Sequence, residues 1–357
     1  MFLRILMTGL LIAGCLTAQD NPFEAPPELQ AFARKTTLHH PSVRAKLQAL
    51  LEGLYRTPEQ GGLGITYDNA YTRTVEEAWR DKKGNCLSLT ALYVSACRAI
   101  DLRVQYAEAL NTTRWRRVGS VIRYERHVVS LVQIPPAEDL VADFLPEFRR
   151  RMGAYRVVIL NEKTMRSLFY ANRAVELMEN GLPEEAIKYA NLSIKVEKRL
   201  SIGWNILGVV EKSLNNLVEA ENSFRKAMLI DPSDVGALGN LEAILRETGR
   251  MDEAGKLREI SHEIRKHDPY FNAFLAEEAM GEGDLDEALR RINTAIKIQP
   301  HDPDFHLARA RIHLLAGKTD AAIKAIQEAQ RRAEPAERAR YDDKMAAIKS
   351  MKEDPKK

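Results

Sequence analysis

Apolar residues recur at helical spacing through the second half of the chain, and a small residue recurs there with a longer period. Alanine stands at five positions separated by intervals of 34 residues: Ala186, Ala220, Ala254, Ala288 and Ala322. Each interval also holds a turn signal containing Asn or Gly between two amphipathic segments. An alanine at one fixed position is expected where two helices cross too closely for a larger side chain. The pattern predicts five stacked helical hairpins, over 167–200, 201–234, 235–268, 269–302 and 303–336.

In the first half of the chain, helical patterns come first and strand patterns follow. Amphipathic stretches predict helices over 28–36, 42–57, 75–82 and 84–100. Alternating or short apolar runs predict strands over 103–110, 127–134, 139–145 and 155–160. This order predicts an α+β domain, residues 28–163, in which a helix packs on an antiparallel sheet. The hairpins then form an all-α solenoid over 164–336, followed by a capping helix and tail over 337–357.

The first residues have the pattern of an export signal. One positive charge, Arg4, precedes an apolar run that is too short to span a bilayer. The run ends in the letters IAGC, with Cys15 last, which resembles a bacterial lipoprotein signal. The resemblance implies a signal peptide over 1–14, a lipid anchor on Cys15, a tether over 15–27 and a place in the bacterial cell envelope, facing the periplasm. Ordinary secretory cleavage after Ala18 is the alternative.

Charge and composition narrow the classes of ligand. The chain has 53 basic and 50 acidic residues, a net charge of +3, which gives no indication of a nucleic-acid partner. His262 and His267 are five residues apart, about 140° around a helix, so they do not form the two-histidine zinc motif. The sequence also has no phosphate-binding glycine loop. We therefore expect no metal and no cofactor.

Two cysteines remain beyond the signal, Cys86 and Cys97. If 84–100 is one helix, the 11 residues between them correspond to roughly 16 Å along its axis. A disulfide needs Cα atoms within about 7 Å, so each is expected to be a free thiol. Cys97 lies in an apolar stripe and is expected to be buried, whereas Cys86 begins the helix among polar neighbours. Cys86 is therefore the candidate for chemistry.

The second hairpin has residues that resemble a known repeat. Its residues matching the tetratricopeptide (TPR) pattern are Trp204, Leu207, Gly208, Ala220, Phe224, Ala227 and Pro232. TPR arrays bind peptides or proteins in a concave groove, so the resemblance implies a protein or peptide partner. By the same resemblance the groove includes Asn205, Val209, Lys212, Arg246, Tyr270, Glu277 and Arg311. The alternatives are that the array is a spacer, or that it docks back on the first domain.

Three short motifs of the first domain follow one another in an informative order. The letters GNCLSLTALYVSACRAI, RHVVSLV and LVADFLPE resemble the transglutaminase-like branch of the papain-fold cysteine enzymes. That family places a cysteine at a helix N-terminus, a histidine on one strand and an aspartate on the next. Position by position, this gives Cys86, His127 and Asp143. The resemblance covers roughly residues 60–146 and implies hydrolysis or acyl transfer at an amide bond.

The chemistry explains why these residue types act together. A thiol attacks a carbonyl as its thiolate, which the partial positive charge at a helix N-terminus favours. An imidazole takes the thiol proton and returns it to the leaving amine, and a carboxylate on the other ring nitrogen fixes the tautomer. The oxyanion needs donors. The candidates are the backbone N–H of Cys86 together with Asn85 or Trp79.

Each of these residues also has a purely structural interpretation. His127 can be a strand histidine with satisfied hydrogen bonds, and Asn85 can be only the helix N-cap. Asp143 can be a turn or cap carboxylate, with Asp139 as a rival orienting group. Taken together, the sequence predicts an exported, membrane-anchored cysteine enzyme whose TPR repeats bind a partner or substrate. The competing hypothesis is a non-catalytic scaffold with the same fold.

Overall fold

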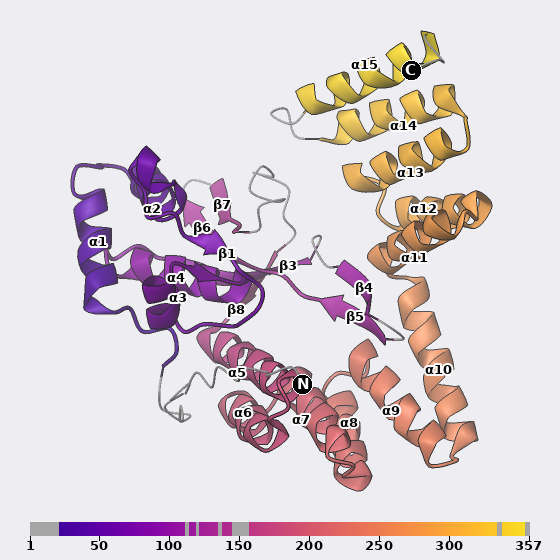
Figure 1. The fold of residues 1–357 in the computed structure, drawn as a ribbon, viewed down its shortest axis with the longest axis horizontal. Helices are drawn as coiled ribbons and strands as arrows, with labels where there is room; N and C mark the ends of the chain where they lie inside the picture. The colour runs from indigo at the N-terminus through magenta and orange to yellow at the C-terminus, as the bar shows by residue number, and fades with distance from the viewer. Residues whose placement is uncertain are drawn as a thin grey trace, which may run out of the picture.

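The computed structural model describes residues 21–110, 114–118, 121–134, 138–144, 157–333 and 338–353. Figure 1 shows an N-terminal part in which helices lie against a small sheet, and an arc of helices that runs from α5 to α15. The predicted signal peptide and Cys15 lie outside the described residues. Within those residues, no helix combines the length and apolar character needed to cross a bilayer.

The N-terminal part is built around one buried helix, α4. Every residue of α4 from 87 to 97 is buried, because neighbouring helices and the sheet surround it. The side chain of Asn85 caps α4 by accepting from the Ser88 N–H, and Thr74 caps α3 by accepting from Glu77. The helices are α1 (Pro27–Thr37), α2 (Val43–Tyr55), the 3-10 turn η1 (Pro58–Gln60), α3 (Val75–Asp81) and α4 (Cys86–Arg98).

The main sheet is antiparallel throughout and has the order β7-β6-β3-β8. Helix α4 packs against β3 and β6, and Thr90 Oγ1 donates to the carbonyl oxygen of Val128 at 3.1 Å. The strands are β3 (Gln105–Ala109), β6 (Val128–Ile134), β7 (Glu138–Ala142) and β8 (Val157–Leu160), with a separate parallel pair β1 (Thr66–Tyr67) and β2 (Lys83–Gly84). Helices followed by an antiparallel sheet match the predicted order of elements.

The predicted tether over 15–27 is too long at its C-terminal end. Phe23 is buried, and its carbonyl oxygen accepts from Ser95 Oγ of α4 at 2.8 Å. The carbonyl oxygen of Pro22 accepts from the N–H of Val75 at 2.8 Å. The packed N-terminal part therefore includes Pro22 and Phe23, because a large aromatic ring in this otherwise polar segment gains more by burial than by exposure.

A two-stranded hairpin reaches from the N-terminal part to the solenoid. Its strands are β4 (Arg114–Val118) and β5 (Val121–Glu125). They are antiparallel, with Arg114 opposite Glu125 at one end and Val118 opposite Val121 at the other. In Figure 1 the hairpin extends towards the inner side of the arc, and β4 contacts helix α11. This contact corresponds to the alternative in which the array docks back on the first domain.

The second half of the chain consists of paired helices. Helices α7, α9, α11 and α13 begin at Ser201, Val235, Pro269 and Pro303, so the pairs repeat every 34 residues. Ala186, Ala220, Ala254, Ala288 and Ala322 are all fully buried. The helices are α5 (Glu162–Glu179), α6 (Pro183–Val196), α7 (Ser201–Ser213), α8 (Leu217–Ile230), α9 (Val235–Glu247), α10 (Met251–Lys266), α11 (Pro269–Glu282), α12 (Leu285–Ile298), α13 (Pro303–Leu315), α14 (Thr319–Arg332) and α15 (Ala339–Glu353).

The first helix pair shares its core with the N-terminal part. Phe169 of α5 is fully buried and meets Phe23 edge to face, with ring centroids 5.9 Å apart. Phe23 in turn packs against Tyr106 of β3 at 5.9 Å. These side chains belong to one apolar cluster with Cys97 of α4, whereas the later repeats form separate clusters. The boundary predicted at residues 163 and 164 is therefore a boundary of the repeat pattern and does not separate two cores.

Candidate active site

Cys86 occupies the first position of α4, directly after the capping residue Asn85. Its side chain is partly exposed, so a solute can reach it. Cys97, eleven residues further along the same helix, is fully buried, and burial raises the pKa of its thiol to about 12. Both cysteines are free, as expected from their spacing. The two thiols on one helix therefore differ sharply in their access to solvent.

His127 and Asp143 meet at one edge of the sheet. His127 directly precedes β6 and Asp143 directly follows β7, and because these neighbouring strands are antiparallel the two residues lie at the same end. His127 Nε2 lies 2.8 Å from Asp143 Oδ2. Both side chains are buried, with exposed fractions of 5% and 2%. The contact is therefore protected from competing water.

Cys86 completes this cluster from the helix side. Burial disfavours the charged imidazolium of His127, but hydrogen bonds to Asp143 and to the Cys86 side chain outweigh burial and raise the pKa of His127 to about 9. Because Nε2 faces Asp143, the other ring nitrogen, Nδ1, is the one left for the thiol. The structure thus brings together the three residues that the family resemblance selected.

Backbone contacts fix the position of the imidazole. The carbonyl oxygen of His127 accepts from the N–H of Ala109 at 2.9 Å, which ties the residue to the end of β3. The neighbouring residue, Arg126, forms a bidentate ion pair with the buried carboxylate of Glu108 on β3. The side chain of Asp139, the rival orienting group, lies outside the described residues.

Asn85 and Trp79, the two predicted oxyanion donors, have other described contacts. Asn85 is the N-cap of α4, and its Nδ2 donates to Thr72 Oγ1 at 2.7 Å. The Trp79 ring packs against Phe32 and lies 3.4 Å under the Lys82 ammonium. Asn85 therefore acts as the helix cap that its structural interpretation predicted. The oxyanion roles stay predictions.

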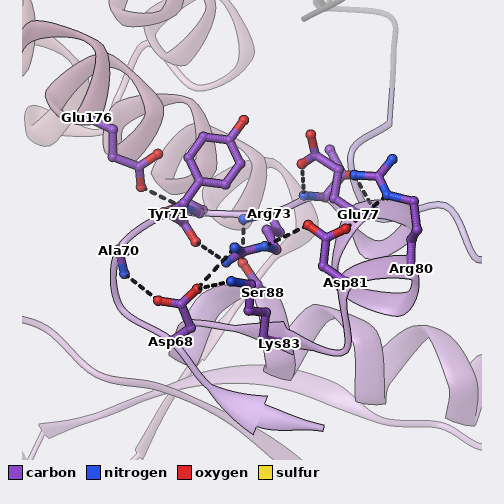
Figure 2. A network of polar contacts seen from close by, with 12 residues as sticks. Asp68, Ala70, Tyr71, Arg73, Glu77, Arg80, Asp81, Lys83, Ser88 and Glu176 are labelled. Carbon is purple, nitrogen blue, oxygen red and sulfur yellow. Dashed lines mark hydrogen bonds and ion pairs between the residues drawn. The ribbon is translucent and has the colours of Figure 1, made fainter. Parts of the chain in front are cut away.

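A polar network around the loop before α3 was not apparent from the sequence, because no periodic pattern marks it. Figure 2 shows Arg73 at its centre, with its guanidinium 3.0 Å from Asp68 and 3.1 Å from Asp81. The N–H of Arg73 donates to Ser88 Oγ of α4 at 2.7 Å. Glu176 reaches the same loop from helix α5 of the solenoid. This network connects the start of α4 with the first helix pair.

The predicted groove residues lie on the first helices of successive pairs, and several of them contact the first helix of the next or preceding pair. Asn205 accepts from Asn240 at 2.9 Å. Two ion pairs repeat this relation, Lys212 with Glu247 at 3.4 Å and Glu277 with Arg311 at 3.8 Å. The remaining predicted positions differ: Tyr270 packs on Phe305, Val209 packs against an apolar cluster, and Arg246 is exposed.

Comparison with known families identifies the repeats. Two tetratricopeptide-repeat models match residues 203–234 and 275–337. A TPR repeat-containing protein of Methanocaldococcus jannaschii is 34% identical over 77 residues, which cover 21% of this chain. The chain spans only 13% of the length of that relative.

Several solved structures match about half of this chain at low sequence identity. MamA of Desulfovibrio magneticus is 17% identical, with a TM-score of 0.27 over 47% of this chain and 94% of its own. PilF of Pseudomonas aeruginosa is 13% identical, with a TM-score of 0.29 over 55% of this chain and 96% of its own. The family models and the described helix pairs agree that the second half of this chain is a solenoid of TPR repeats, a fold used for protein–protein interaction.

Proposed function

We propose that the N-terminal part is a transglutaminase-like cysteine enzyme that acts on amide bonds, and that the TPR repeats bind its protein partner or substrate. The observation that carries the proposal is the cluster of a partly exposed Cys86, a buried His127 and a buried Asp143, joined by hydrogen bonds. A nucleophile, a base and an orienting carboxylate in this relation are what covalent amide chemistry requires.

Each residue has a defined part in the reaction. Cys86 Sγ, after giving its proton to His127, attacks the amide carbonyl carbon and forms a tetrahedral oxyanion at the end of α4. Collapse of this intermediate breaks the C–N bond, and His127 returns the proton to the leaving amine. Asp143, at 2.8 Å, holds the ring and stabilises the imidazolium. Water or an amine then attacks the Cys86 thioester, which gives hydrolysis or acyl transfer.

The repeats recruit the macromolecule on which this chemistry acts. Helices α7, α9, α11 and α13 present polar side chains on one face, and the TPR fold binds partners on such a face. The alternative, a scaffold that uses both parts for binding without chemistry, is decided by the reactivity of Cys86.

A cysteine-directed probe tests the proposal. Full-length protein and Cys86→Ala are treated with a chloroacetamide probe in the cells that express them, and the labelled peptides are identified by mass spectrometry. We expect rapid labelling of the Cys86 peptide, and an acyl adduct on Cys86 when an amide substrate of a bound partner is present. Slow labelling of Cys86 and Cys97 at similar rates would indicate the scaffold instead.

The proposed location follows from the resemblance of the N-terminal letters to a lipoprotein signal. Cys15 would carry the lipid, placing the enzyme on a membrane of the cell envelope and facing the periplasm. We expect Cys15→Ser to block processing or to release the chain from membranes, measured by fractionation and by the mass of the N-terminal peptide. A mature wild-type chain that begins at Gln19 and does not sediment with membranes contradicts the anchor.

A further inference from the structure

We infer that Glu176 and Arg173, in the first helix of the TPR solenoid, position Cys86 by clamping the backbone of Thr72. The inference rests on the proposed function, because it assigns positioning residues to the proposed nucleophile. It makes the first repeat a working part of the active site as well as the start of a binding surface.

The first link of this path joins Cys86 to Thr72. Cys86 follows the cap residue Asn85, so the orientation of the cap sets the direction in which the first turn of α4 presents the thiol. The carboxamide of Asn85 is held at both ends: Oδ1 accepts from the Ser88 N–H at 3.0 Å, and Nδ2 donates to Thr72 Oγ1 at 2.7 Å. Asn85 and Thr72 are both buried, so water does not replace these contacts.

The second link joins Thr72 to helix α5. The N–H of Thr72 donates to Glu176 Oε1 at 2.7 Å, and Arg173 Nη1 donates to the Thr72 carbonyl oxygen at 3.3 Å. One residue of the loop thus has its N–H, its C=O and its hydroxyl held by three side chains. Arg173 also lies over the Tyr71 ring at 3.9 Å, which fixes the guanidinium itself.

Glu176 is half-buried between the buried residues Thr72 and Arg173, and this position is unfavourable for a charged carboxylate. Burial raises the pKa of Glu176 despite the opposing hydrogen bond from Thr72 and the charges of Arg173 and Arg73. Glu176 Oε2 has no hydrogen-bond partner among the described residues. The only hydrogen bond that this carboxylate makes among the described residues is the one from Thr72 to Oε1. We therefore infer that the role of Glu176 is to hold the loop in position.

The test compares rates of Cys86 alkylation by iodoacetamide in the full-length protein. Glu176→Ala is expected to lower the rate about tenfold, because the thiol loses its position relative to His127. The dependence of the rate on pH should also shift towards that of His127→Ala, because the Cys86 thiol is no longer held against the imidazole. Glu176→Gln should restore the rate, because its carboxamide oxygen still accepts from Thr72. Glu184→Ala, an exposed glutamate on α6, is the matched control and should leave the rate unchanged.

Thr72→Val provides a second, independent variant. The substitution removes the hydroxyl that accepts from Asn85 and changes the side-chain volume little. It should lower the rate of Cys86 alkylation about as much as Glu176→Ala does. The double variant should be little slower than either single one, because both act on one path. A fast wild-type Cys86 whose rate is unchanged in Glu176→Ala and Thr72→Val overturns the clamp alone. A wild-type Cys86 that reacts as slowly as Cys97 overturns the proposed function, and the clamp with it.

Discussion

Replacing His127 by alanine is expected to slow the alkylation of Cys86 at about pH 7 by roughly ten- to thirtyfold. An ordinary thiol is only about 3% thiolate at that pH, so a thiol that has lost its imidazole partner reacts mainly through this small fraction. The gain in thiolate is partly offset by lower nucleophilicity, which sets the lower end of the range. Asp143→Ala should have a smaller effect in the same direction, because the carboxylate acts on the thiol only through the ring.

The effect of His127→Ala should depend on pH in a defined direction. Because the pKa of His127 is raised to about 9, the imidazolium is present at neutral pH and is lost as the pH rises through 9. The ratio of wild-type to variant rates should therefore be largest near pH 7 and should approach one above about pH 9. The stabilisation that protonated His127 contributes to folding is complete below its ordinary pKa of about 6.5, and is lost between 6.5 and 9. Its share of the unfolding free energy should decline over the same interval.

Cys97 is the internal control for both measurements. It lies on the same helix, is fully buried, and has a pKa raised to about 12. Its peptide should stay unlabelled in wild type and in His127→Ala alike, as long as the chain is folded. Equal Cys86 rates in both proteins at every pH would contradict a working pair of thiol and imidazole.

The features that were predictable from the sequence are those set by short stretches of chain. A helical hairpin of 34 residues is a local unit, so Ala220 and its counterparts mark the repeats without knowledge of the rest. The start of α4 is also local, because Asn85 caps it and an apolar stripe follows. The order of Cys86, His127 and Asp143 was readable through a family resemblance, since their meeting depends on strand pairing that single residues do not reveal.

The features that escaped prediction depend on contacts between distant segments. Thr72 and Arg73 meet Glu176 from a distant part of the chain. Residues 68–74 have no periodic pattern from which these contacts could be predicted. Phe169 has the spacing expected of any repeat helix, and the pattern of α5 does not tell whether its apolar face meets another repeat or the N-terminal part. That ambiguity is why the sequence predicts two domains, over 28–163 and 164–336, where the structure has one apolar cluster across the junction.

Phe169→Ala is expected to lower the free energy of unfolding by about 3–5 kcal/mol, and to do so for the N-terminal part and the first repeat together. The ring is fully buried, and it contacts Phe23 at 5.9 Å and Tyr170 at 5.5 Å, so its loss leaves a cavity at the junction. Denaturant titrations report this through two probes: helical signal for the solenoid, and labelling of Cys97 for the N-terminal part. Both transitions should move to lower denaturant in Phe169→Ala.

Phe224→Ala is the matched variant that separates a shared core from simple loss of a large side chain. Phe224 is also fully buried, but it belongs to the cluster formed by α8, α9 and α10. Phe224→Ala should therefore lower the stability of the solenoid, and should shift the Cys97 transition much less than Phe169→Ala does. If Phe169→Ala left the Cys97 transition in place, the two parts would fold as separate units, and the boundary between residues 163 and 164 would be a true domain boundary. If both unfolding transitions move together, α5 belongs to both parts. The proposed path from the first repeat to Cys86 requires this.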